Sequence, residues 1–257
     1  MKRQPRPAII LKSRAEIDTI RAAGRILFGC LQAVRAAAVE RVRTRDLDAL
    51  AEAYIRERKG VPAFKGYRGF PATLCISVNE EVVHGIPNGY RVKSGDILSV
   101  DCGVVFEGLI ADSALTIPIG EISEPTKKLL KVTEEALYLG IEQARSGNYV
   151  VDISRAVQEY VEGHGFSVVR DLVGHGVGHS MHEEPQVPNF VTEGEKGAKL
   201  EVGMVIAIEP MVNVGTYEVS VKKDGWTIVT GDKLSSAHYE HTVAITTNGP
   251  EILTNGE

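Results

Sequence analysis

SGDILSVDCGVVFEGLIADSALTIPIG, residues 94–120, is the stretch that decides the fold. Its alternating apolar residues predict a β-hairpin with a tight turn at Glu107-Gly108. That turn pairs Asp112 with Gly103, so Asp101 and Asp112 become diagonal neighbours on one face; a turn one residue earlier would place them directly opposite. Two carboxylates on an apolar ribbon favour a bound cation. From this stretch alone, one aspartate could instead face solvent while the other caps a turn.

Composition indicates a soluble globular protein of 257 residues with 43% hydrophobic residues. The net charge of -5 argues against a general nucleic-acid binder. No run of 18 apolar residues is present, so the sequence predicts no membrane span. Three cysteines without CxxC spacing are not a disulfide framework. We expect Cys30 in the core, and Cys75 and Cys102 near a pocket.

The start of the chain is basic, with Lys2, Arg3 and Arg6 before the short apolar run Ala8-Ile9-Ile10-Leu11. This run is too short for the core of a signal peptide. We therefore expect a cytoplasmic protein with a flexible basic tail over residues 1–12.

Outward from the hairpin, two series of elements have the same order. The first has helices over 14–39, opened by a Ser13–Glu16 capping box, and 45–59, capped by Thr44. An aromatic loop, 61–71, and a strand, 73–78, follow. The second series has helices over 126–145 and 152–162, and strands over 166–173, 202–212 (carrying Glu209) and 240–246.

This order amounts to a weak internal repeat. GDILSVD, residues 95–101, matches GMVIAIE, residues 203–209, and His84-Gly85 matches His175-Gly176. Two-fold related halves, 13–120 and 121–250 of a single catalytic domain spanning 1–257, would bring Asp101 and Asp112 opposite Glu209 and Glu240. Chance similarity between amphipathic segments is the alternative.

Four carboxylates and a histidine form a hard, oxygen-rich ligand set that suits Mn²⁺, Fe²⁺, Co²⁺ or Zn²⁺. Bridging carboxylates suit two such ions about 3.5–4 Å apart, which activate water and polarise a carbonyl. The chemistry indicated is hydrolysis. A helical zinc pair, His175-x-x-x-His179, is disfavoured because Gly176 and Gly178 oppose a helix.

Five motifs, in this order, resemble the type I methionine aminopeptidases: VVHGIP (82–87), the hairpin, GHGVGHSMHEEP (174–185), IEPM (208–211) and SAHYEHTVAIT (236–246). The resemblance spans residues 14–254. It implies the α/β (α+β) pita-bread fold, with two pseudo-two-fold related helix-helix-hairpin halves around a central antiparallel sheet. It also implies removal of the initiator methionine from nascent chains whose second residue is small.

The resemblance implies roles residue by residue. Two divalent ions (Co, Mn, Fe, Zn or Ni) would be held by Asp101, Asp112, His175, Glu209 and Glu240. Glu209 would also move a proton, and His84 and His182 would contact the substrate and stabilise its oxyanion. His164, His238 and His241 are expected to be structural or to support ligands.

For the methionine side chain, the resemblance implies a pocket of Tyr67, Phe70, Cys75, Met181 and Trp226, with His84 and His182 beside it. Phe64 and Met181 depart from the residues of some relatives and leave the pocket's fine shape open. Asn79 and Ser236 match a monovalent-cation site. A monomer with transient ribosome contact and no nucleic-acid specificity is implied.

Two other functions are compatible with this fold. A prolidase or X-Pro aminopeptidase shares the fold but usually carries a further N-terminal domain. A catalytically inactive ribosome- or nucleic-acid-binding protein would have lost metal ligands, whereas all five are present.

Overall fold

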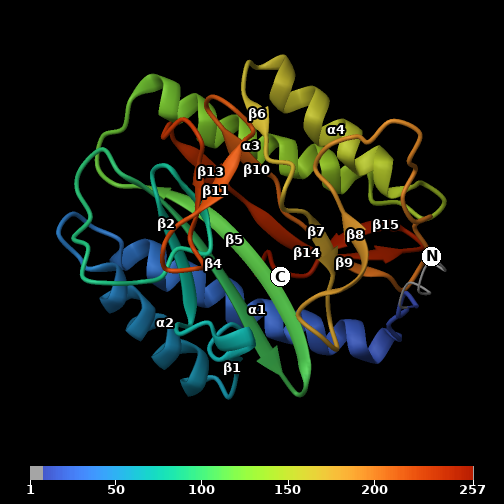
Figure 1. Cartoon of the computed structure of the whole chain (residues 1–257). Coiled ribbons are helices and arrows are strands. Elements are labelled where there is room, and N and C mark those ends of the chain that lie inside the picture. The colour runs from blue at the N-terminus through green and yellow to red at the C-terminus, as the bar shows by residue number, and fades with distance from the viewer. Residues whose placement is uncertain (1–7, 257) are drawn as a thin grey trace.

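The computed structural model describes residues 8–256. Two helix pairs flank a central sheet, with α1–α2 below the strands and α3–α4 above them in Figure 1. The helices are α1 (Arg14–Ala37), α2 (Thr44–Glu57), α3 (Glu124–Gln143) and α4 (Val150–Gly163), with a short 3₁₀ turn, η1 (Tyr67–Gly69).

The main sheet has nine strands: β1 (Val61–Pro62), β2 (Leu74–Val78), β4 (Ile97–Phe106), β5 (Leu109–Pro118), β7 (Gly174–Gly176), β8 (Glu183–Val187), β9 (Val205–Ile208), β14 (Glu240–Thr246) and β15 (Gly249–Ile252). Its order is β1-β4-β5-β14-β9-β7-β8; β2 also pairs with β4, and β15 with β14. Every pairing is antiparallel. Since β5 pairs with β14, the two halves of the chain join at the centre of this sheet.

Two three-stranded sheets complete the fold. One has the order β13-β10-β6 and the other β11-β12-β3. Their strands are β3 (Glu81–Val83), β6 (Ser167–Val168), β10 (Met211–Asn213), β11 (Val219–Val221), β12 (Ile228–Thr230) and β13 (Ser236–His238).

The β4–β5 hairpin confirms the predicted register. Gly103 pairs with Asp112 and Phe106 with Leu109, so Glu107 and Gly108 form the turn. Both turn residues have positive φ, 47° and 83°, as a hairpin turn that follows the strand twist requires. Asp101 and Asp112 therefore lie on the same face of the ribbon.

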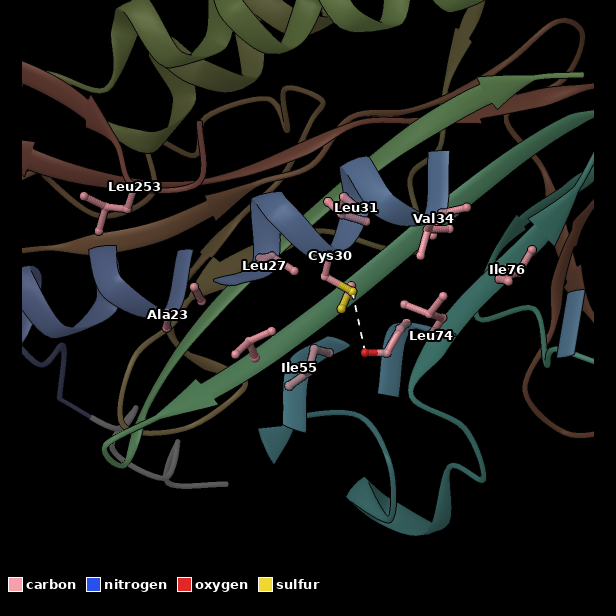
Figure 2. Packing of buried hydrophobic residues seen from close by; sticks show 14 of the residues in the cluster. Ala23, Leu27, Cys30, Leu31, Val34, Ile55, Leu74, Ile76 and Leu253 are labelled. Atoms are coloured by element: carbon pink, nitrogen blue, oxygen red, sulfur yellow. Dashed lines mark hydrogen bonds between the residues drawn. The ribbon is translucent and has the colours of Figure 1, made fainter. Parts of the chain in front are cut away.

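The first helix pair packs on this hairpin through an apolar core. The predicted Ser13–Glu16 capping box opens α1. Figure 2 shows Leu27, Leu31 and Val34 of α1 with Ile55 of α2 and the β2 side chains Leu74 and Ile76. Cys30 also lies in this core, as predicted, and its Sγ contacts the Ala51 carbonyl at 3.8 Å. These contacts fix the back of the sheet, so the carboxylates project from its other face.

The second helix pair packs in an equivalent way. Leu129 and Val132 of α3 and Val157 of α4 bury their side chains with Val212 of β10 and Ala237 of β13. Each half thus uses two helices to cover strands that lead to the centre of the molecule.

Three predicted local features were wrong. Thr44 is the first residue of α2 and not its cap; its hydroxyl instead donates to the Asn88 carbonyl at 3.1 Å. The strand expected over 166–173 is limited to Ser167–Val168. The strand expected over 202–212 breaks at Glu209-Pro210, because proline has no N–H for a central ladder.

That break separates two sheets. β9 belongs to the nine-stranded sheet, while β10 belongs to the sheet with β13 and β6. Glu209 lies between them with irregular backbone, and this lets its side chain turn toward the carboxylates of β4, β5 and β14.

The flexible tail predicted over 1–12 lies outside the described residues for 1–7. From residue 8 onward the segment is attached to the fold at two points: Ile9 packs on the core that contains Ile206 and Ile208, and Lys12 is buried, whereas Ile10 and Leu11 are exposed. Among residues 8–256 we find no helix with the length and hydropathy needed to cross a bilayer.

Candidate metal centre

A cavity of about 200 Å³ opens between the two halves. Every residue predicted for catalysis, divalent metals or the methionine pocket lines it: Tyr67, Phe70, Cys75, His84, Asp101, Asp112, His175, Met181, His182, Glu209, Trp226 and Glu240. The sequence did not single out five further lining residues, Arg68, Val83, Leu172, Val173 and Met211.

Strand pairing explains why three carboxylates converge. Ala114 of β5 lies opposite Asp101 of β4 on one side and opposite Glu240 of β14 on the other. Residues directly opposite one another share a face, and Asp112, two residues from Ala114, shares it too. The sheet alone thus collects Asp101, Asp112 and Glu240, and Glu209 reaches them from the break after β9.

Three of these carboxylates each have one oxygen that the described part of the chain leaves unpaired. Asp101 Oδ1, Asp112 Oδ1 and Glu240 Oε1 are buried and have no hydrogen-bond partner among residues 8–256. Leaving a buried charged acceptor unpaired costs several kcal/mol. A divalent cation is the partner that this donor set fits, because it supplies the missing positive charge to several oxygens at once.

The cost of burying these charges also appears in the carboxyl pKa values, which are raised. Burial, followed by the charge of Glu240, raises the pKa of Asp101 to about 8. Burial raises the pKa of Glu240 to about 8. Burial and then the neighbouring Glu240 raise the pKa values of Asp112 and Glu209 well above their usual range. Without a cation the cluster therefore holds protons near neutral pH.

A hydrogen bond to the backbone fixes which ring nitrogen of His175 is free to bind a metal. Its Nδ1 lies 2.9 Å from the Gly176 carbonyl, which can only accept, so Nδ1 carries the proton. The free lone pair is then on Nε2, 3.4 Å from Glu209 Oε1 and 3.9 Å from Asp112 Oδ2. Burial, then the His182 charge, lowers the pKa of His175 to about 4, which keeps the ring neutral for metal binding.

Two groups of possible ligand atoms can be drawn within residues 8–256. Asp112, His175 and Glu240 form one and Asp101, His238 and Glu240 the other, with the ligand atoms of each within 4.8 Å of one another. Glu240 belongs to both, as a bridging carboxylate would.

His238, expected to be structural or to support a ligand, lies beside Glu240. It is 1% exposed, its Nδ1 has no hydrogen-bond partner, and its Nε2 lies 3.8 Å from Glu240 Oε2. The available signal was its spacing: His238 and Glu240 stand two apart in an extended segment and so project to the same side.

His84 and His182 line the same cavity as the carboxylates. The His182 ring centroid is 4.3 Å from that of His175, and its Nδ1 is 2.9 Å from the Tyr67 hydroxyl. Burial, followed by the charges of His238 and His182, lowers the pKa of His84 to about 4. Burial and then Arg68 lower the pKa of His182. Neutral rings each keep one N–H that can donate to a substrate oxygen.

The other end of the cavity is apolar. Phe70 and Trp226 meet edge to face, with ring centroids 5.2 Å apart at 75°. Phe64, Cys75 and Met181 are buried in the same cluster. Both residues whose effect the sequence left open, Phe64 and Met181, therefore pack as ordinary members of the pocket wall.

Several other predicted residues lie elsewhere. Cys102 packs in the first core with Cys30, since strand alternation turns it away from Asp101. His241 faces the side of the sheet opposite to the carboxylates, where its Nδ1 lies 2.8 Å from Thr254 Oγ1. His164 bonds the Tyr160 carbonyl at the end of α4.

Asn79 and Ser236 are adjacent to each other but outside the cavity lining. The Ser236 N–H donates to the Asn79 carbonyl at 2.9 Å. The Asn79 side chain is already used, because it donates to Asp96 Oδ1 at 2.9 Å and accepts from the Ile97 N–H at 3.0 Å. A monovalent cation here would have to rely mainly on carbonyl oxygens.

Comparison with known proteins places this arrangement in a family. The model of metallopeptidase family M24 matches residues 18–247. A methionine aminopeptidase of Clostridium acetobutylicum is 54% identical over 247 residues, which cover 96% of this chain and 98% of the relative.

Comparison with solved structures supports the same family. The methionine aminopeptidase of Thermotoga maritima superposes with a TM-score of 0.93 at 46% identity, covering 96% of this chain and 99% of that one. The prolidase of Pyrococcus furiosus shares the fold at a TM-score of 0.80 and 25% identity, and this chain covers 66% of it. The predicted pita-bread α/β fold is thereby confirmed, and the chain belongs to metallopeptidase family M24, among its type I methionine aminopeptidases.

Proposed function

We propose that the protein removes the initiator methionine from nascent chains and peptides whose second residue is small, using two divalent ions and a water nucleophile. It would act in the cytoplasm as a monomer, in transient contact with the ribosome. The observation that carries the proposal is the cavity itself. One end holds partnerless carboxylate oxygens, and the other is an apolar pocket for a single side chain.

Asp101, Asp112, His175, Glu209 and Glu240 would hold the ions. When bound, two such ions supply Lewis acidity that lowers the pKa of a water and polarises the carbonyl of the scissile bond. The identity of the ions is left open among Co, Mn, Fe, Zn and Ni. A monovalent cation near Asn79 and Ser236 would add stability to the neighbouring loops.

The chain's own residues would do the remaining work. Glu209 would take a proton from the attacking water and deliver it to the leaving amine. His182 and His84 would donate N–H groups to the oxyanion that develops on the substrate carbonyl. The apolar cluster would exclude water and orient the methionine side chain.

Loading the ions is expected to release at least about one proton per protein at pH 7. Metal binding needs ionised carboxylates, whereas pKa values of about 8 leave Asp101 and Glu240 largely protonated there. The affinity of the protein for the divalent ions should therefore rise with pH between 6 and 8, roughly tenfold per pH unit for each proton released. Calorimetric titration with Mn²⁺ in two buffers of different ionisation enthalpy measures this number. Equal heats in both buffers would contradict it.

Methionine should be preferred over leucine at the substrate N-terminus by at least roughly tenfold in kcat/KM. Met is unbranched and polarizable, and its sulfur contacts aromatic rings such as Phe70 and Trp226 favourably. Leucine branches at Cγ and meets the wall that Phe64 and Met181 form. Competing cleavage of Met-Ala-Ser and Leu-Ala-Ser checks the ratio, and Trp226→Ala should reduce it. Equal rates with the unmodified protein would reject the methionine assignment but keep the aminopeptidase class.

One assay separates the proposal from its rivals. We expect the Mn²⁺- or Co²⁺-loaded protein to cleave Met-Ala-Ser, to lose activity with chelator, and to leave X-Pro peptides and Met-Leu-Ser largely intact. Preferential cleavage of X-Pro peptides would favour the prolidase function seen in its structural relative. Failure to cleave any of these peptides at full metal loading would favour a binding role.

A further inference from the structure

The loop between β7 and β8, residues 177–182, carries two residues of the proposed active site, Met181 and His182. Its residues form neither a helix nor a strand. Something outside the loop must therefore hold these two side chains toward the cavity.

A buried ion pair connects this loop to the start of the chain. Lys12 Nζ pairs with Glu183 Oε2, and the two side chains are 1% and 5% exposed. The other Glu183 oxygen accepts the Ser180 N–H at 2.9 Å, so the carboxylate also fastens the loop's own backbone. Glu183 directly follows His182 in the chain, so its buried carboxylate is a fixed point next to the residue that carries the imidazole.

Lys12 is itself fixed from three directions. Its backbone N–H donates to the Gly203 carbonyl at 2.7 Å, and its ammonium also donates to the Ile10 carbonyl at 3.1 Å. Its Cε packs on Gly178, where a Cβ would come within 2.7 Å. Gly178 has φ +147°, which side chains rarely adopt, so this close approach depends on glycine.

Further contacts anchor the first half of the loop. The Ile110 N–H of β5 donates to the Gly178 carbonyl at 2.8 Å, and His179 Nε2 lies 3.0 Å from Glu16 Oε1 of α1. The loop is thereby held by the β4–β5 hairpin at one end and by Lys12 at the other.

Burying an ion pair seldom adds net stability, because desolvation of both charges offsets their attraction. Its best-supported use is to select one conformation over others. We propose that Lys12 is a positioning residue for the proposed reaction: through Glu183 it holds the 177–182 loop so that His182 faces the scissile carbonyl and Met181 faces the methionine pocket.

The test is a double-mutant cycle between Lys12→Met and His182→Ala in the Mn²⁺-loaded full chain, with Met-Ala-Ser as substrate. Lys12→Met should lower kcat by roughly 10–100-fold, the cost of about 1 Å of misplacement. In the His182→Ala background the same change should lower kcat less than about twofold, because the residue through which it acts on kcat is gone. Any part of the effect that passes through Met181 and the methionine pocket should remain and appear in KM. Metal stoichiometry should stay unchanged in both backgrounds.

Two further variants keep the result interpretable. Lys127→Met removes an exposed ammonium that pairs with Glu124 on α3 and should leave kcat unchanged. If Lys12→Met fails to fold, Lys12→Met/Glu183→Gln leaves no unpaired buried charge, and it should show the same dependence on His182.

Equal fold-losses from Lys12→Met in both backgrounds, or an unchanged kcat, would overturn the positioning role. The inference rests on the proposed function, but different results would reject each. If the unmodified chain does not cleave Met-Ala-Ser, the proposed function is wrong. If it cleaves Met-Ala-Ser normally and the double-mutant cycle shows no coupling, only the role of Lys12 is rejected.

Discussion

Glu209→Gln is expected to lower kcat for Met-Ala-Ser by at least about 10²–10⁴-fold, the usual range for loss of a general acid–base. The substitution keeps the side chain's size but removes both a proposed metal ligand and the proposed proton carrier. Glu209 is placed to carry a proton because its side chain lines the cavity beside the other carboxylates, with Oε1 3.4 Å from His175 Nε2. Steady-state kinetics at saturating Mn²⁺ measure the change.

The control for this variant is Glu193→Gln, a change of the same chemistry in the exposed loop after β8. It should leave kcat unchanged. Circular dichroism should show that Glu209→Gln keeps the fold, because Glu209 lies at a break between two strands and bears no ladder of its own. Near-normal turnover by Glu209→Gln at full metal loading would remove Glu209 from the mechanism.

The hairpin could be predicted from the sequence because local rules fix it. The turn at Glu107-Gly108 fixes the register of the two strands, and successive side chains in a strand point to opposite faces. Asp101 and Asp112 must therefore lie on the same face. The same alternation should have excluded Cys102 from the cavity, since it is the neighbour of Asp101.

Other features depend on contacts that no local pattern encodes. Pro210 is a local signal that the strand breaks, but the sequence does not show that the segments on its two sides join different sheets. That change of sheet is visible only once the partners β14 and β13 are known. Lys12 follows a basic, tail-like segment, yet its partner Glu183 lies 171 residues away. The sequence assigns His238 no more than a structural or ligand-supporting role, because its position near Asp101 arises from tertiary packing.

The two central histidines, though adjacent in space, differ in what surrounds them. His175 has one nitrogen committed to the Gly176 carbonyl and the other beside Glu209 and Asp112. His182 has its Nδ1 beside the Tyr67 hydroxyl and stacks on the Tyr67 ring at a centroid distance of 5.5 Å. The first environment suits a metal ligand and the second a hydrogen-bond donor on the substrate side.

Alanine substitution should therefore separate metal binding from catalysis. His182→Ala is expected to lower kcat roughly 10²-fold, the low end for losing one oxyanion donor, with unchanged metal stoichiometry. His175→Ala should instead raise the metal dissociation constant by more than about 100-fold, since loss of even an outer partner of a ligand costs about 10–100-fold. Activity should return in part at high Mn²⁺ for His175→Ala but not for His182→Ala.

Calorimetric titration and kinetics over a range of Mn²⁺ concentrations measure both quantities on the same samples. His164→Ala is the matched control, because that imidazole bonds the Tyr160 carbonyl at the end of α4 and lines no part of the cavity. It should change neither metal affinity nor kcat. If His182→Ala weakened metal binding while His175→Ala left it intact, the roles assigned to the two histidines would have to be exchanged. The carboxylate cluster would remain the metal site in that case, because its partnerless oxygens belong to Asp101, Asp112 and Glu240 and do not depend on either imidazole.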